Sequence, residues 1–121
     1  MLKVLIVDDD NDLLEMVTLV LRTHGMEVFS VNDHTDFFTT LSNYRPDLVV
    51  LDIYLGDADG RELCRQLKNT EEFSDIPVVL YSAGHISSSS IEDCQANDFL
   101  QKPFDISILL KRIRQQVPQS G

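Results

Sequence analysis

The chain has 121 residues, with 20 acidic against 10 basic side chains and a formal net charge of -10. This length predicts one domain, residues 1–121, which can bury a hydrophobic core without disulfides. The negative charge argues against binding to nucleic acid or to anionic membranes, because both are bound through clustered Lys and Arg side chains.

The N-terminus carries Met1 to Lys3, four apolar residues and then acids, which is too short and too acidic for a signal peptide. No apolar run reaches the length needed to span a membrane. Cys64 and Cys94 form no Cys-x-x-Cys pair, as is typical of reduced structural cysteines. These features predict a cytoplasmic protein.

In the first half of the chain, apolar runs predict strands over residues 2–7, 27–31 and 48–51. A helix is expected after Asp10 and Asp12, whose side chains can cap it, and Gly25 should end it. The apolar residues Phe37, Phe38 and Leu41 predict a second helix before the third strand.

In the second half, a helix should follow Gly60, and strands are expected over residues 77–81 and 99–100. Residues 85–95 carry four serines and few apolar anchors, so their helix is the least favourable of the set. An apolar stripe from Ile106 to Val117 predicts the last helix, and Pro118 should close it.

Five strands alternating with five helices predict an α/β fold: a doubly wound, five-stranded parallel sheet of the flavodoxin-like (βα)5 type. The strand order 2-1-3-4-5 fits this pattern best. Its switch point lies between strands 1 and 3, and ligands bind in open α/β sheets at the carboxyl ends of strands beside such a point.

A polar side chain follows four of the five apolar runs at the point where the strand ends. These residues are Asp8 with Asp9, Asp52, Ser82 and Lys102. Because the carboxyl ends of parallel strands share one edge of the sheet, we expect these side chains to converge.

Three carboxylates about 5 Å apart repel one another by roughly 3 kcal/mol per pair at an effective dielectric of about 20. A hard divalent cation removes this repulsion, and Mg²⁺ typically joins one or two carboxylates to a phosphate. Asp52 is therefore a candidate nucleophile toward a phosphoryl group. Lys102 and the Ser82 hydroxyl can stabilise charge on the transferring oxygens.

Four segments of the chain resemble the receiver domain of two-component response regulators, and the resemblance covers nearly all of the sequence. They are residues 4–10 (VLIVDDD), 51–53 (LDI) with Gly60 further on, 81–83 (YSA) and 99–104 (FLQKPF). The resemblance implies that Asp52 is the phosphoacceptor, and that Ser82, Ala83 and Lys102 bind phosphate oxygens.

The same resemblance implies a Mg²⁺ site made by Asp9, Asp52 and the backbone carbonyl of Tyr54, with Asp8 bound directly or through water. Ser82 and Phe99 would form the switch, in which the aromatic ring turns inward as the hydroxyl moves toward phosphate. The peptide between Lys102 and Pro103 would be cis, as X-Pro bonds alone commonly are.

The implied partners are a histidine kinase or histidine phosphotransfer protein as phosphodonor and a downstream protein, with a monomer or phosphorylation-dependent dimer as the assembly. Such a receiver is not an enzyme, beyond assisting its own phosphorylation and dephosphorylation. Since residues 1–121 are filled by one domain, we expect the signal to pass by contact.

Three positions depart from the family's usual pattern. Gly56 stands where proline is common, which should loosen the loop after Asp52. Gln95 stands where glycine often ends the fourth helix, so that end should be strained. Phe99 lacks the hydroxyl of the common tyrosine.

An enzyme of the haloacid-dehalogenase-type phosphatase class is the alternative, with a nucleophile from residues 8–10. The chain is short for such an enzyme, has no further acidic pair after Lys102, and would leave Asp52 without a role. A flavin-binding module is disfavoured by the acidic loop after the first strand, which repels phosphate. A calcium loop fails because Leu13 stands where Gly is needed.

Overall fold

The structure is a computed structural model that describes residues 1–84, 86–102 and 104–117. The strands of its five-stranded parallel sheet are β1 (Lys3–Val7), β2 (Glu27–Val31), β3 (Leu48–Asp52), β6 (Val78–Ser82) and β7 (Asp98–Gln101). They lie in the order β2-β1-β3-β6-β7. Because β6 and β7 are the fourth and fifth predicted strands, the predicted order 2-1-3-4-5 is confirmed.

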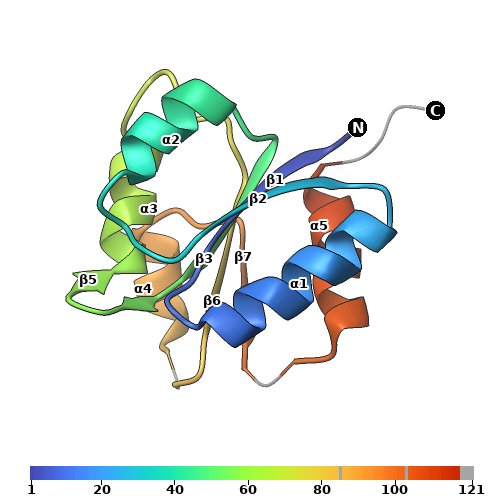
Figure 1. Cartoon of the computed structure of the whole chain (residues 1–121). Helices are drawn as coiled ribbons and strands as arrows, with labels where there is room; N and C mark the ends of the chain where they lie inside the picture. The colour runs from blue at the N-terminus through green and yellow to red at the C-terminus, as the bar shows by residue number, and fades with distance from the viewer. Residues whose placement is uncertain (85, 103, 118–121) are drawn as a thin grey trace.

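Helices cover both faces of the sheet (Figure 1). Those on one face are α1 (Asn11–Thr23) and α5 (Ile106–Gln116); those on the other are α2 (Phe37–Tyr44), α3 (Gly60–Lys68) and α4 (Ser88–Asp93). Each predicted helix is present, so the doubly wound (βα)5 architecture is confirmed. Among the described residues, no helix is long and apolar enough to cross a membrane.

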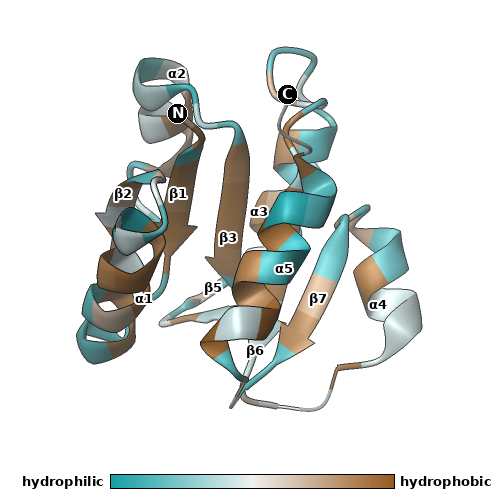
Figure 2. Ribbon diagram, turned by 90° about the vertical axis from the view of Figure 1, so that its right-hand side faces the viewer, coloured by the Kyte–Doolittle hydropathy of each residue, from teal (hydrophilic) through white to brown (hydrophobic). Residues whose placement is uncertain are grey.

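The hydrophobic core lies in two layers, because successive strand residues point to opposite faces of the sheet. Val4 and Ile6 face the layer under α1 and α5, whereas Leu5 and Val7 face the layer under α2 and α3. Every residue of β3 and β6 is buried. In Figure 2, β1 and β3 are accordingly hydrophobic along most of their length, whereas the edge strands β2 and β7 carry more polar residues.

A short antiparallel hairpin, β4 (Tyr54–Leu55) with β5 (Ala58–Asp59), follows β3 and was not predicted from the sequence. Gly56 lies in its two-residue turn with φ 62°. Proline fixes φ near −65° and could not adopt this conformation. Glycine therefore makes a paired hairpin possible here, and the expectation that Gly56 loosens this loop stays a prediction.

The observed helix ends agree with those predicted from the sequence, except that one predicted cap is wrong. Asp10 caps α1, accepting hydrogen bonds from the backbone amides of Asp12 and Leu13, so Asp12 lies inside the first turn and is not a cap. Gly25, with φ 84°, ends the same helix as predicted. Gln95 follows α4 with φ 65°, which confirms the expected strain at that end. The expectations for Pro103 and Pro118 lie outside the described residues.

Candidate functional site

The carboxyl ends of β1 and β3 bring three acids together. Asp8 and Asp9 follow β1, and Asp52 is the last residue of β3. One carboxylate oxygen from each of the three lies within 4.8 Å of the others. Asp8 and Asp52 are buried, whereas Asp9 is exposed. The cluster therefore has two fixed acids beneath one that faces solvent.

Asp52, on β3, is the register partner of Tyr81 on the neighbouring strand β6. Its Oδ1 accepts a hydrogen bond from the backbone amide of Tyr54 at 3.2 Å. Burial, and then the negative charge of Asp8, raise the pKa of Asp52 to about 6. The carboxylate is thus ionised at neutral pH, at an energetic cost that a cation would relieve.

Asp8 is completely buried and is held by three donors. Its Oδ2 accepts hydrogen bonds from the Tyr81 hydroxyl at 2.6 Å and from Lys102 Nζ at 3.0 Å, and its Oδ1 accepts one from the Asp10 amide at 2.9 Å. Burial acts to raise the pKa of Asp8, but these hydrogen bonds outweigh it and hold the pKa below its ordinary value. Asp8 is therefore the firmly ionised acid of the pair.

Lys102 joins the two buried acids from the end of β7. Its Nζ lies 3.3 Å from Asp52 Oδ2 in addition to its contact with Asp8. Its backbone amide donates to the Ser82 carbonyl at 2.7 Å, which fixes the end of β7 beside β6. Burial acts to lower the pKa of Lys102, but the two carboxylates raise it. The ammonium is charged and neutralises part of the acidic cluster.

The alternation of strand residues explains why these side chains meet. Strand residues two positions apart point to the same face of the sheet. The core layer under α1 and α5 contains Ile6, Val50 and Leu100, and two positions after each of these residues stand Asp8, Asp52 and Lys102. Tyr81 belongs to the same layer and completes the group. The sequence pattern does not single out Tyr81, because a tyrosine at the end of an apolar run is typical of a buried strand.

The other side chains and backbone groups predicted for the site belong to Ser82, Ala83 and Phe99. Ser82 is buried, and its hydroxyl accepts a hydrogen bond from the Gly84 amide at 3.2 Å. Ala83 follows it at the surface. Phe99 is half-buried and packs on the core layer under α2 and α3, so it lies on the sheet face opposite to Asp52 and Tyr81.

Two glycines shape the rim of the site. A Cβ on Gly60 would lie 2.1 Å from the backbone oxygen of Asp52, a distance that no side chain tolerates. A Cβ on Gly84 would lie 3.3 Å from the hydroxyl oxygen of Tyr54, which is half-exposed over the site. Gly60 is therefore required for the backbone around Asp52 to close, which gives a physical reason for its place in the motif.

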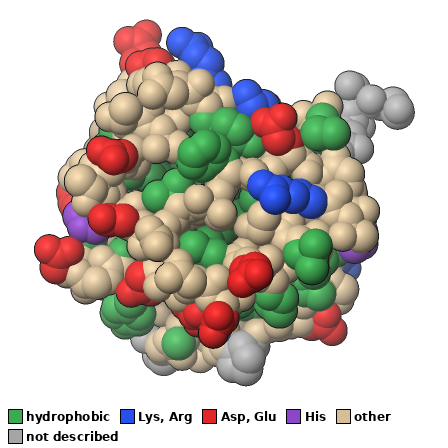
Figure 3. Space-filling view, in the orientation of Figure 1, with side chains coloured by type: hydrophobic (Ala, Val, Ile, Leu, Met, Phe, Trp, Pro, Cys, Tyr) green, Lys and Arg blue, Asp and Glu red, His purple; other side chains and the backbone are tan. Residues whose placement is uncertain are grey.

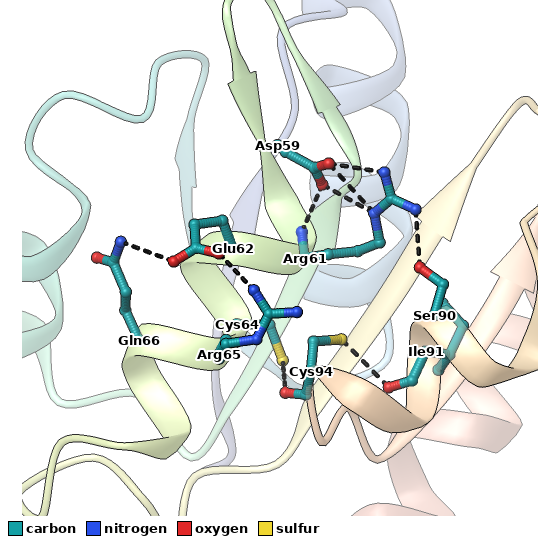
Figure 4. A network of polar contacts seen from close by, with 9 residues as sticks. All are labelled: Asp59, Arg61, Glu62, Cys64, Arg65, Gln66, Ser90, Ile91 and Cys94. Atoms are coloured by element: carbon teal, nitrogen blue, oxygen red, sulfur yellow. Dashed lines mark hydrogen bonds and ion pairs between the residues drawn. The ribbon is translucent and has the colours of Figure 1, made fainter.

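Behind the site, one arginine connects the hairpin to α4 (Figure 4). The Arg61 guanidinium contacts both carboxylate oxygens of Asp59, at 3.0 Å from Nε and 2.7 Å from Nη2. Its Nη1 donates to the Ser90 hydroxyl at 2.8 Å. On the same side, the Cys64 thiol donates to the Cys94 carbonyl at 3.3 Å. The segment that follows Asp52 is thereby joined to the fourth helix.

The donor set fits a hard divalent cation. Three carboxylates whose oxygens lie within 4.8 Å supply the oxygen ligands that Mg²⁺ prefers. At this separation each pair of charges repels by about 3 kcal/mol at an effective dielectric of about 20, and one ammonium cannot remove all of that repulsion. The chemistry of the cluster is that of a metal and phosphate site.

Comparisons with known proteins agree with this geometry. The family model of the response regulator receiver domain matches residues 4–114. The chain is 36% identical over 93% of its length to the response regulator MprA of a Mycobacterium species, and 35% identical over 93% to the DNA-binding response regulator MtrA of Mycobacterium tuberculosis. It covers 49% of each, so it spans about half the length of these curated relatives.

A solved structure of a putative response regulator from Chloroflexus aurantiacus superposes with a TM-score of 0.89 at 29% identity, covering 97% of this chain and 98% of that one. The chain therefore belongs to the response regulator receiver family, whose members are signalling domains of two-component systems. Because the name of MtrA describes a DNA-binding protein, the expectation of no contact with nucleic acid is not confirmed.

Proposed function

We propose that residues 1–121 form one receiver domain that accepts a phosphoryl group on Asp52. The observation that best supports this proposal is the position of the Asp52 carboxylate. Lys102 Nζ lies 3.3 Å from it, and oxygens of Asp8 and Asp9 lie within 4.8 Å. A nucleophile, an ammonium and two further acids thus meet at the switch point of the sheet, where phosphate ligands bind in this architecture.

In the proposed step, a carboxylate oxygen of Asp52 attacks the phosphorus of a phosphohistidine on a histidine kinase or phosphotransfer protein. A P–O bond forms as the P–N bond breaks, and the electron pair stays with the departing imidazole nitrogen. With its pKa raised to about 6, Asp52 is ionised at neutral pH and needs no separate base.

Charge on the three equatorial oxygens of the transferring group needs neutralisation from the protein. Lys102 can supply it by moving from the carboxylates to a phosphoryl oxygen, and the Ser82 hydroxyl and the Ala83 amide can donate to others. Asp8, Asp9, Asp52 and the Tyr54 carbonyl would hold Mg²⁺, which when bound offsets the negative charge shared by the acids and the phosphoryl group.

Phosphorylation would then change the surface that binds a downstream protein. The Ser82 hydroxyl accepts a hydrogen bond from the Gly84 amide, so its own proton remains available to donate to a phosphoryl oxygen. Phe99, half-buried on the opposite face, is the residue we propose to follow it. The protein would act as a monomer or a phosphorylation-dependent dimer.

Intact-mass measurement with acetyl phosphate and magnesium tests the proposal. The wild-type chain should gain one phosphoryl group, Asp52→Asn none, and the exposed Asp75→Asn control the same as wild type. Equal labelling of Asp52→Asn and wild type would refute the proposal. Labelling of Asp8 with continuous phosphate release would favour a phosphatase of the haloacid-dehalogenase type.

A further inference from the structure

Tyr81 makes a contact that the phosphoryl-transfer step leaves without a role. It is completely buried at the end of β6, beside Asp52 in the register of the sheet. Its hydroxyl donates to Asp8 Oδ2 at 2.6 Å, and Lys102 Nζ lies 4.5 Å from the centre of its ring. The ring also packs against Phe104, at 5.6 Å between centroids. One side chain thus contacts both Asp8 and Lys102.

The donors on Asp8 show what this contact can do. Both Tyr81 and Lys102 donate to Oδ2, whereas Oδ1 accepts only the Asp10 amide among the described residues. A buried carboxylate that loses a donor is left with an unsatisfied charge, which is far more costly than an exposed one. When Lys102 moves to a phosphoryl oxygen, Tyr81 is the side-chain donor that stays with Asp8.

We propose that Tyr81 is a positioning residue that keeps Asp8 hydrogen-bonded and oriented while Lys102 is released to the phosphoryl group. This inference rests on the proposed phosphoryl transfer to Asp52. A tyrosine hydroxyl is protonated at neutral pH, so Tyr81 remains a donor to Asp8 Oδ2.

A purely structural role for Tyr81 makes a different prediction. Buried tyrosines usually find a partner for their hydroxyl, and the ring alone could serve to fill the core. In that case Tyr81→Phe would lower stability and leave the maximal rate of Asp52 labelling unchanged. If the Tyr81 hydroxyl instead allows Lys102 to leave Asp8, Lys102 stays bound to Asp8 in Tyr81→Phe. Labelling of Asp52 then slows even at saturating magnesium and phosphodonor.

Tyr81→Phe is the direct test, because it keeps the ring and its contacts with Lys102 and Phe104. Tyr44→Phe is a matched control: Tyr44 ends α2 and carries the ammonium of Lys3 4.7 Å from its ring centre. Tyr81→Phe should lower the maximal labelling rate by about tenfold, the scale of one hydrogen bond to a charged group, and change the half-saturating acetyl phosphate concentration much less. A maximal rate equal to that of wild type and Tyr44→Phe would overturn the inference.

Two further measurements separate positioning from packing. In an Asp8→Asn background the effect of Tyr81→Phe should shrink to less than about twofold, because a neutral amide does not retain the ammonium. In the wild-type chain, the ¹³C resonance of the Tyr81 ring carbon that bears the hydroxyl should shift on phosphorylation; it is assigned as the signal that persists in both Tyr44→Phe and Tyr54→Phe. An undiminished effect of Tyr81→Phe in the Asp8→Asn background would overturn the inference. An unmoved resonance in the wild-type chain would overturn it even if Tyr81→Phe failed to fold.

The outcomes also separate this inference from the proposed function. If Asp52→Asn is labelled like wild type, the phosphoacceptor assignment fails, whatever Tyr81→Phe does. If labelling requires Asp52 and Tyr81→Phe reacts at the wild-type rate, the role of Tyr81 alone fails.

Discussion

At the scale of single residues, two neighbouring carboxylates are driven in opposite directions by their surroundings. Asp8 receives three hydrogen bonds, and its pKa lies below the ordinary value despite its burial. Asp52 accepts a hydrogen bond from the Tyr54 amide and shares the Lys102 ammonium, 3.3 Å away, with Asp8. The pKa of Asp52 is raised to about 6. The acid proposed as nucleophile is thus the one that the folded chain stabilises least as an anion.

This difference predicts opposite stability effects in the absence of metal. The folded-state pKa of Asp52 exceeds its ordinary 3.8, so its favourable contribution is present below that value and is lost as the pH rises through about 6. At about pH 8, Asp52→Asn should raise the free energy of unfolding by up to roughly 3 kcal/mol, measured by denaturant titration with a chelator present.

Asp8→Asn provides the contrast for this measurement. The depressed pKa of Asp8 contributes stability above its unfolded value, and that stability is lost as the pH falls. Asp8→Asn should therefore destabilise the chain at about pH 8. The advantage of Asp52→Asn over wild type should vanish by about pH 3, below the ordinary pKa of 3.8, where Asp52 is mostly protonated in both the folded and the unfolded state. Destabilisation by Asp52→Asn at high pH would contradict the assigned cause.

The convergence of Asp8, Asp9, Asp52 and Lys102 could be predicted from the sequence, because strand ends in a parallel sheet share an edge; their roles stay predictions. Tyr81 could not be found by the same rule, since it lies one residue before a strand end. The usable signal was period-two alternation, which places Tyr81 on the same face as Asp52. A phenol predicted to be buried beside carboxylates needs a hydrogen-bond partner there.

At the scale of secondary-structure elements, α4 differs from the other described helices in burying none of its six residues. Its connections to α3 are the Arg61 hydrogen bond to Ser90 and the Cys64 hydrogen bond to the Cys94 carbonyl (Figure 4). The serine run predicted a marginal helix, and the structure adds the arginine that holds it to the hairpin after Asp52.

Arg61→Lys should therefore loosen α4 selectively. Lysine cannot bridge Asp59 and Ser90 as the planar guanidinium does. Hydrogen exchange should become faster over residues 88–93 and stay unchanged over β1 and β3. Arg65→Lys is the control, because Arg65 pairs with Glu62 within α3. In wild type, residues 86–96 should be the least protected helical segment, with protection that changes on phosphorylation. Equal exchange in the two variants would contradict this role of Arg61.

The left-handed residue after α4 gives a second prediction at this scale. Gln95, with φ 65°, occupies a conformation that costs a residue with a Cβ roughly 1 kcal/mol relative to glycine. Gln95→Gly should raise the free energy of unfolding by about that amount. Asn69→Gly at the end of α3, where φ is −90°, should give no gain. A loss of stability in Gln95→Gly would show that the glutamine side chain contributes more than its backbone strain costs.

At the scale of the whole molecule, the five strands of the sheet and their order could be predicted from apolar runs that alternate with helices, but the β4–β5 hairpin could not. Each of its strands has two residues, too few to show a period, and Gly56 acts through the sign of φ, which the sequence alone does not reveal. The net charge of -10, in contrast, follows directly from the sequence. Acidic side chains spread over the left and lower parts of the face in Figure 3, so the site lies within a predominantly negative molecule.

Repulsion among Asp8, Asp9 and Asp52 predicts that magnesium stabilises the entire fold. Binding to the native state alone contributes about 2.7 kcal/mol at roughly a hundredfold excess over the dissociation constant, which corresponds to a melting-temperature increase of about 10 °C. Asp9→Ala should remove most of this increase, because it deletes the solvent-facing acid of the cluster. Asp75→Ala removes the same charge from an exposed position before the amino end of β6 and should keep the full response. A magnesium response that both variants retain would mean that the cation stabilises the chain through its overall charge and not through the site at the ends of β1 and β3.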